Sequence, residues 1–150
     1  MSDDYEDYER ACEAIRADNA MLLEEFAAWL DAQGLSPKTV SKHQNNIAFY
    51  VNEFLLYEEA IPAADGAGNV GMFLGYWFIR KAMWASQTSL KENAASLKKF
   101  YRFMHERGDI DKDELDDMHE QIKEGLPEWL ETMQRYDDPA IENPEDIWRF

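Results

Sequence analysis

The sequence predicts an all-α protein built around a single helical bundle. Every long segment repeats its apolar residues with the 3.6-residue period of an amphipathic helix, and none alternates apolar and polar residues as a half-buried strand does. The chain has 150 residues, 45% of them hydrophobic and 13% aromatic, which is enough to bury one sizeable core. We therefore expect one compact domain of four or five helices with acidic ends.

The first elements are expected before residue 57. Residues 1–18 are highly charged and are predicted to form an acidic N-terminal tail or a short docking helix. A firmer helix is predicted from Asn19 to about Gln33, with Gly34 as its C-terminal cap. Ser36 followed by Pro37 is a strong start for the next helix, because serine caps free amides and proline has no amide to lose in the first turn.

The second half of the chain follows the same logic. Residues 62–71 are rich in Ala, Gly and Asp and are expected to form a long loop, after which the helical pattern resumes at Val70. Ser86 is predicted to cap a long helix that ends at Gly108. Residues 111–150 are expected to form an acidic helical extension that starts at Asp111 or Asp113, is interrupted at Gly125 and restarts at Pro127, before an extended end.

Charge is divided by position along the chain. Residues 36–107 carry nine of the 15 Lys and Arg but six of the 31 Asp and Glu, so the middle is near +3 in a chain of net charge -16. Residues 1–35 sum to -8 and residues 108–150 to -11. This pattern indicates a mildly basic module with acidic ends, which constrains the choice of partner more than the fold.

Two predicted helices carry basic residues opposite their apolar faces. Lys38, Lys42, Asn45 and Asn46 lie on the helix that follows Ser36, and Lys91, Lys98, Lys99 and Arg102 lie on the helix that follows Ser86, close to Thr88 and Ser89. Cations together with hydroxyls near helix N-termini are groups that bind a phosphate backbone. Ordinary solvated helix faces would give the same pattern.

The runs FAAWLDAQGLSPKTVSKHQNNIAFYVNEFL and SQTSLKENAASLKKFYRFMHERGDI resemble the N-terminal core-binding domain of tyrosine recombinases and phage integrases. The resemblance covers residues 19–110. It depends on Gly34, on Ser36 with Thr39, and on a later segment that includes Leu97, Phe100, Tyr101, Phe103 and Gly108. It implies a SAM-like four-helix bundle of two helix hairpins, followed here by the additional acidic helix, and it implies binding to duplex DNA.

By position, the resemblance implies DNA contacts from residues that largely coincide with the basic stripe: Ser36, Lys38, Thr39, Lys42, Ser86, Thr88, Ser89, Lys91 and Lys98. Recombinase chemistry needs a Tyr nucleophile supported by Arg and His in a large C-terminal domain, and this chain has no His-x-x-Arg motif and only 42 residues after Gly108. We therefore expect an integrase-like accessory module with no catalytic residue, and not a recombinase acting alone.

Other site chemistries have weaker support. A lone Cys12 and three histidines give no zinc pattern, and the acidic run from Asp109 to Glu120 has Glu114 where an EF-hand calcium loop needs glycine. We expect no cofactor and no metal. The acidic start of the chain and the lack of a long apolar run favour a cytoplasmic protein with no membrane partner.

The acidic C-terminal segment supports an alternative function. Its aromatic residues Trp129, Trp148 and Phe150 could pack onto the bundle, form a partner surface or make a dimer contact. The protein would then be an interaction or regulatory module that has kept the fold and lost DNA binding. A third possibility is that residues 111–150 cover the basic face, which would make DNA binding conditional.

Overall fold

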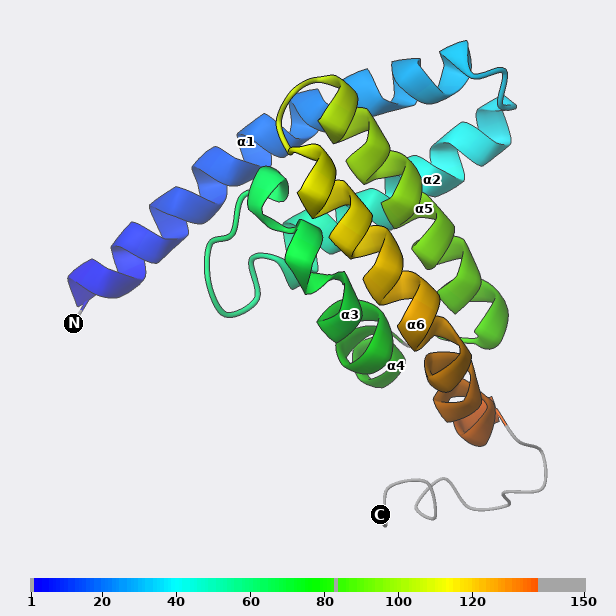
Figure 1. Cartoon of the computed structure of the whole chain (residues 1–150). Coiled ribbons are helices and arrows are strands. Elements are labelled where there is room, and N and C mark those ends of the chain that lie inside the picture. Colours follow the sequence, from blue (N-terminus) through cyan, green and yellow to red (C-terminus); the bar gives the residue numbers. More distant parts are fainter. Residues whose placement is uncertain (1, 83, 138–150) are drawn as a thin grey trace.

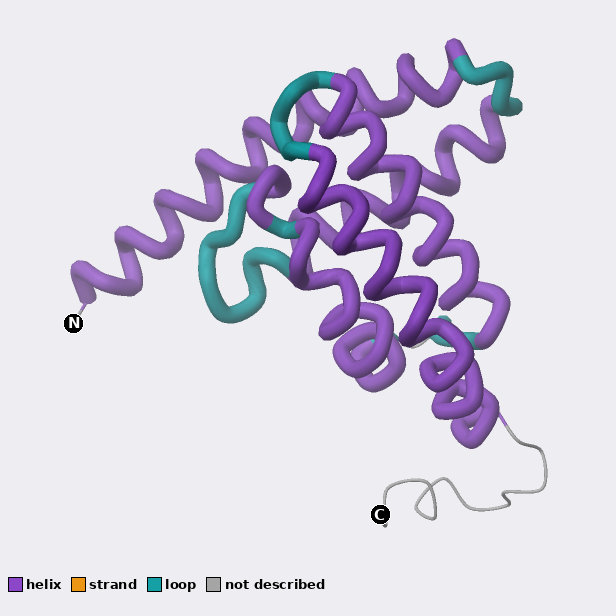
Figure 2. The backbone as a smooth tube through the Cα atoms, viewed as in Figure 1, coloured by secondary structure: helices purple, strands orange, loops and turns teal. Residues whose placement is uncertain are grey.

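The structure is a computed structural model that describes residues 2–82 and 84–137, and all of its regular elements in these ranges are helical (Figures 1 and 2). The long helices are α1 (Ser2–Ala32), α2 (Pro37–Phe49), α5 (Gln87–Glu106) and α6 (Lys112–Asp137). Between α2 and α5 lie the π-helix η1 (Tyr50–Phe54), the 3-10 turns η2 (Ala63–Asp65) and η3 (Ala67–Asn69), α3 (Val70–Met72), the π-helix η4 (Phe73–Trp77) and α4 (Phe78–Lys81). The all-α prediction is confirmed.

The long helices form two antiparallel pairs (Figure 1). α1 and α2 make one pair, which turns at Gly34 with φ 88°, and α5 and α6 make the other, which turns at Gly108 with φ 90°. Both glycines hold the left-handed conformation that other residues rarely adopt, so the predicted helix ends at these positions are confirmed. α2 packs against α5, and the segment from η3 to η4 packs against α6.

Aromatic side chains fill the centre of the bundle. Phe26 of α1 meets Phe100 of α5 edge to face, with ring centroids 5.3 Å apart. Two buried tyrosines tie the loop between η1 and α3 to this core, because Tyr50 donates a hydrogen bond to the Gly66 carbonyl (2.7 Å) and Tyr101 donates one to the Ala63 carbonyl (2.9 Å). These two hydrogen bonds to backbone carbonyls hold the segment predicted as a loop, residues 62–71, against the core.

The expected division at residue 18 is not a break in the helix, because α1 runs without interruption from Ser2 to Ala32. Asn19 is buried and its amide donates to the Val51 carbonyl (3.2 Å) and to the Asn52 side chain (2.9 Å). Further toward the N-terminus, Cys12 is buried and Tyr8 donates to the Leu56 carbonyl. The acidic tail is thus the first half of one docked helix, and its start projects beyond the bundle (Figure 1).

The acidic helix begins as expected but is not interrupted. Asp111 accepts a hydrogen bond from the Glu114 amide (2.8 Å), which caps the start of α6. The predicted break at Gly125 and Pro127 is wrong, since α6 continues through both residues. Leu115, Met118 and Ile122 are buried against the rest of the bundle, so tertiary packing supplies the stability that the local sequence lacks. Within the described ranges, no helix has the length and apolar character needed to span a membrane.

Candidate nucleic-acid interface

A small polar cluster lies where α2 crosses α5. Ser96 of α5 is fully buried and its hydroxyl donates to the Glu92 carbonyl (3.0 Å). The same oxygen accepts a hydrogen bond from the Asn46 amide (3.0 Å) and lies 2.7 Å from Nδ1 of His43. Because the single Ser96 proton is used toward Glu92, His43 must donate from Nδ1, which fixes its neutral tautomer.

Cations from both helices surround this cluster. Lys42 of α2 forms an ion pair with Glu92 of α5, with 3.2 Å between the charged atoms. Burial lowers the pKa of His43, and the positive charges of Lys99 and Lys42 lower it further against the opposing effect of Glu92. The Lys42–Glu92 ion pair joins the polar faces of α2 and α5 where the two helices cross.

The same arrangement is repeated where α5 meets α6. His119 of α6 is partly buried, and its Nε2 has no hydrogen-bond partner among the described residues. Burial is the main cause that lowers the pKa of His119, followed by Arg102 and Lys98 of α5, while Asp116 opposes them.

The cations predicted from the sequence remain accessible. Lys38, Lys42, Lys91 and Arg102 are exposed, and Lys98 and Lys99 are partly exposed. In the part of the chain that the structure describes, Lys42 is the one member of this group that takes part in an ion pair. Within the same ranges, the acidic side chains of α6 form no ion pair with these cations. We call the six residues named in this paragraph the cationic face.

The predicted hydroxyls are used mainly inside the protein. Ser36 caps α2 by accepting a hydrogen bond from the Thr39 amide (3.3 Å), and the two hydroxyls lie 3.0 Å apart. Ser86 and Ser89 form a reciprocal capping box at the start of α5. Thr88 is exposed beside them. These side chains shape the helix N-termini, so the cations are the principal groups that the site offers to a ligand.

Asn45 and Asn46 were predicted to lie together on the polar face, but Asn46 turns into the α2–α5 crossing while Asn45 is exposed. The sequence analysis also overlooked His43 and Ser96 as a buried pair. The apolar spacing of His43 with Ile47, Tyr50 and Phe54 was a local signal for burial of the histidine. Nothing local signals the pairing of Ser96 with His43 and Asn46, because these two side chains lie 50 or more residues away.

Trp129 is partly buried and packs against the core. Its ring lies against Gly75 of η4 and Gly125 of α6, where a Cβ atom on either glycine would approach ring atoms closer than 3.0 Å. Of the roles considered for Trp129 from the sequence, these contacts correspond to packing of the C-terminal segment onto the bundle. Trp148 and Phe150 lie outside the described residues.

Metal chemistry has no support among residues 2–82 and 84–137, which contain no group of three or more His, Cys, Asp or Glu able to hold an ion. The acidic run after Gly108 instead caps and begins α6. No protein-family model, no curated protein and no solved structure matches this chain.

Proposed function

We propose that this protein is a non-catalytic module that binds duplex DNA through phosphate contacts from the cationic face. The observation that supports the proposal is that Lys42 of α2 forms an ion pair with Glu92 of α5 at the crossing of the two helices that carry the exposed cations. The sequence resemblance of residues 19–110 to recombinase core-binding domains supports the same conclusion, as does the pairing of helices into hairpins. The SAM-like classification is part of this proposal.

The expected affinity is modest and strongly dependent on salt. Setting aside Lys42, which is paired with Glu92, five cations remain for phosphate contacts. For five neutralised phosphates the slope of log K against log salt is about -4.5, which corresponds to a loss of roughly 500-fold between about 50 and 200 mM salt. A net charge of -16 opposes long-range attraction, but screening over about 8 Å lets the cationic face act locally.

The test is a salt titration of a short fluorescent duplex, followed by anisotropy. In a Lys91→Glu, Lys98→Glu variant we expect at least about a tenfold loss of affinity and a salt slope that is smaller by about 2. The matched control is Arg10→Glu, Arg16→Glu, which makes the same change in net charge on exposed residues of α1. Absence of wild-type binding at about 50 mM salt, or equal losses in both variants, would refute the proposal.

Masking by the acidic extension is tested without truncation, because Leu115, Met118 and Ile122 of α6 belong to the core, and removing α6 would expose the core residues that they cover. An Asp116→Asn, Glu120→Gln variant removes two exposed negative charges from α6 and leaves the cations in place. It should bind DNA several-fold more tightly than the wild type. An unchanged affinity in this variant would exclude repulsion by α6 as a limit on binding.

A protein-interaction role is the second candidate function. It is supported by large apolar side chains that stay exposed around η1 and α4, at Tyr57, Tyr76 and Trp84. A chain that fails the DNA titration at every salt concentration, yet depends on these side chains for association, belongs to this second class.

A further inference from the structure

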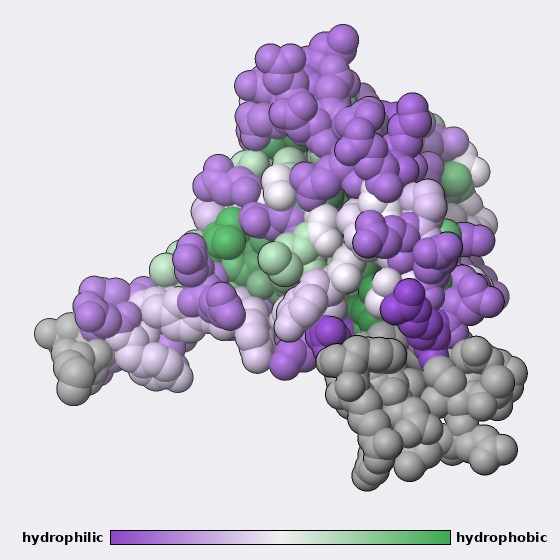
Figure 3. All heavy atoms as spheres, turned by 60° about the horizontal axis from the view of Figure 1, so that its bottom comes forward, coloured by the Kyte–Doolittle hydropathy of each residue, from purple (hydrophilic) through white to green (hydrophobic). Residues whose placement is uncertain are grey.

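Exposed large apolar side chains concentrate on one side of the molecule. Among the described residues six such side chains are more than half exposed, and four of them are Tyr57 (55%), Met72 (60%), Tyr76 (54%) and Trp84 (57%). We call these four residues the aromatic surface. Figure 3, in which the bottom of Figure 1 comes forward, shows weakly polar and hydrophobic residues forming a band between strongly hydrophilic regions.

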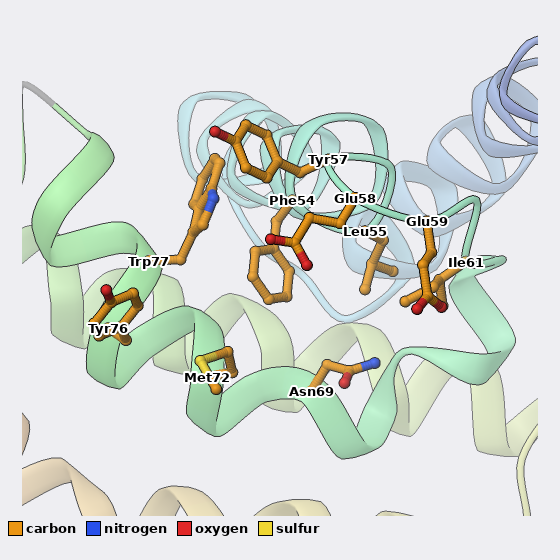
Figure 4. A pocket seen from close by; sticks show the side chains of 10 residues that line it. All are labelled: Phe54, Leu55, Tyr57, Glu58, Glu59, Ile61, Asn69, Met72, Tyr76 and Trp77. Atoms are coloured by element: carbon orange, nitrogen blue, oxygen red, sulfur yellow. The ribbon is translucent and has the colours of Figure 1, made fainter. Parts of the chain in front are cut away.

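Ring contacts join this surface into a continuous layer. The Tyr57 ring lies 5.8 Å from the Trp77 ring, Trp77 lies 5.4 Å from Phe49, and Phe49 lies 5.1 Å from Trp84. The last residue of η1 (Phe54) and the last two of η4 (Tyr76 and Trp77) help to line a hollow of about 410 Å³ beside it, which Tyr57 and Met72 also line (Figure 4). π-helical turns cost stability and are often found at functional sites.

Opposite charges flank the aromatic surface. Glu59 lines the hollow at one end, beside Ile61, and the Glu58 carboxylate reaches over its middle toward Phe54 (Figure 4). At the other end, α4 leaves Trp77 in the direction away from Glu59 and carries two cations. The Arg80 guanidinium lies 4.7 Å from the centre of the Tyr76 ring, and Nζ of Lys81 lies 5.5 Å from that of Tyr57. The order across the surface is acidic, aromatic, basic.

We propose that the aromatic surface is the interface of a symmetric homodimer. A two-fold axis brings the same patch of both subunits together, so such an interface must be self-complementary. An aromatic centre with carboxylates at one end and cations at the other meets this requirement, since rotation by 180° sets the acidic end of each copy against the basic end of the other. Tyr, Trp, Met and Arg are also the residues enriched at the centres of protein interfaces.

A second copy fits this surface better than a partner of one charge. A strongly basic partner would meet Arg80 and Lys81, and a strongly acidic one would meet Glu58 and Glu59, so each would leave one end repelled. The net charge of -16 on each copy is screened over about 8 Å at physiological salt, and so it does not prevent contact through a locally balanced patch.

The test is sedimentation equilibrium of the full chain. We expect the wild type to dimerise and a Tyr76→Ala, Trp84→Ala variant to raise the dimer dissociation constant at least about tenfold. The matched control is Tyr5→Ala, Met21→Ala, which removes two still more exposed apolar side chains from α1 and should leave the dissociation constant unchanged. A wild type that is monomeric at every concentration, or a control that weakens association equally, overturns the proposal.

A charge swap tests the symmetry itself. Glu58→Lys, Glu59→Lys and Arg80→Glu, Lys81→Glu should each give a monomer, because each sets like charges against each other at both ends of the interface. An equimolar mixture of the two variants should form heterodimers, since opposite charges then face each other at both ends. Circular dichroism checks that each variant is folded. Folded variants that stay monomeric when mixed show that the interface is not the one proposed.

Discussion

Replacing Gly125 with alanine tests how Trp129 holds the acidic helix against the bundle. Gly125 lies inside α6 with Trp129 one turn further along, and Gly75 of η4 lies on the other side of the same ring. A Cβ atom at position 125 would lie 2.5 Å from Cε2 and 2.6 Å from Cη2 of that ring. Real Cβ atoms do not approach other atoms so closely, so the indole would have to move.

Two opposing effects set the magnitude of this change. Alanine in a helix interior is favoured over glycine by about 1 kcal/mol, because it loses less backbone entropy. Overpacking a tight contact costs about 1 to 3 kcal/mol, and the rigid two-ring indole relaxes poorly. We expect overpacking to win, with a net destabilisation of about 1 kcal/mol and a Tm lower by about 3 °C.

The assay is urea unfolding of four proteins that form a double-mutant cycle: the wild type, Gly125→Ala, Trp129→Ala and the double variant. Without the indole the clash is gone and only the helix propensity remains, so Gly125→Ala should stabilise the Trp129→Ala protein by about 1 kcal/mol. The sign of the same substitution therefore reverses between backgrounds, which is a coupling free energy of about 2 kcal/mol. Gly68→Ala is the control, because no atom lies within 4 Å of its Cβ position.

This reasoning is refuted if Gly125→Ala raises the free energy of unfolding both in the wild type and in the Trp129→Ala protein. The indole would then not occupy the space above Gly125. A loss of stability in both backgrounds would equally contradict the packing argument, because it would place the cause in the helix backbone and not in the ring.

Two further predictions concern buried polar groups. Tyr50→Phe should lower the free energy of unfolding by about 1 to 3 kcal/mol in urea titrations, because the buried Gly66 carbonyl loses its hydrogen-bond donor; a change below about 0.5 kcal/mol would show that water replaces the hydroxyl. Burial, then Lys99 and Lys42, lower the pKa of His43 below its usual 6.5, so the unfolded chain binds this proton at higher pH than the native protein. Stability should therefore fall as the pH drops below 6.5, and His43→Gln should lose part of that dependence in unfolding measurements from about pH 8 to pH 5. An unchanged pH dependence in this variant would contradict the shift.

The fold was largely predictable from local signals, and its two misplaced breaks have one physical cause. Gly34, Ser36 and Ser86 end or begin helices as their types suggest, because caps act on neighbouring backbone groups. The breaks expected before Asn19 and at Gly125 are absent because contacts with residues distant in the sequence stabilise a continuous helix at both positions. Asn19 bonds to Val51 and Asn52 of η1, and Gly125 leaves room for a tryptophan. Tertiary packing overrides weak local preferences at such positions.

The candidate site was predictable to a smaller extent. Helical periodicity is enough to place Lys91, Lys98 and Arg102 on one face of a helix, since their spacing is seven and four residues. Periodicity cannot say which side of a second helix that face meets. The cap roles of Ser36 and Ser86 were predicted, but those roles use the same hydroxyls that were also predicted to contact DNA. Tyr57 and Tyr76 of the aromatic surface escaped prediction for a related reason, because their spacings are typical of core residues.

The two proposed surfaces are tested separately, but dimerisation through one changes the number of phosphates that the other can contact. A two-fold axis through the aromatic surface duplicates the rest of the subunit, so a dimer carries two cationic faces. If both faces contact one duplex, the number of neutralised phosphates doubles and the salt slope changes from about -4.5 to about -9. Variants in Tyr76 and Trp84 that stay monomeric should keep the smaller slope, and variants in Lys91 and Lys98 should still dimerise. Each surface can therefore fail without the other, and the slope measured for the wild type reports whether they act together.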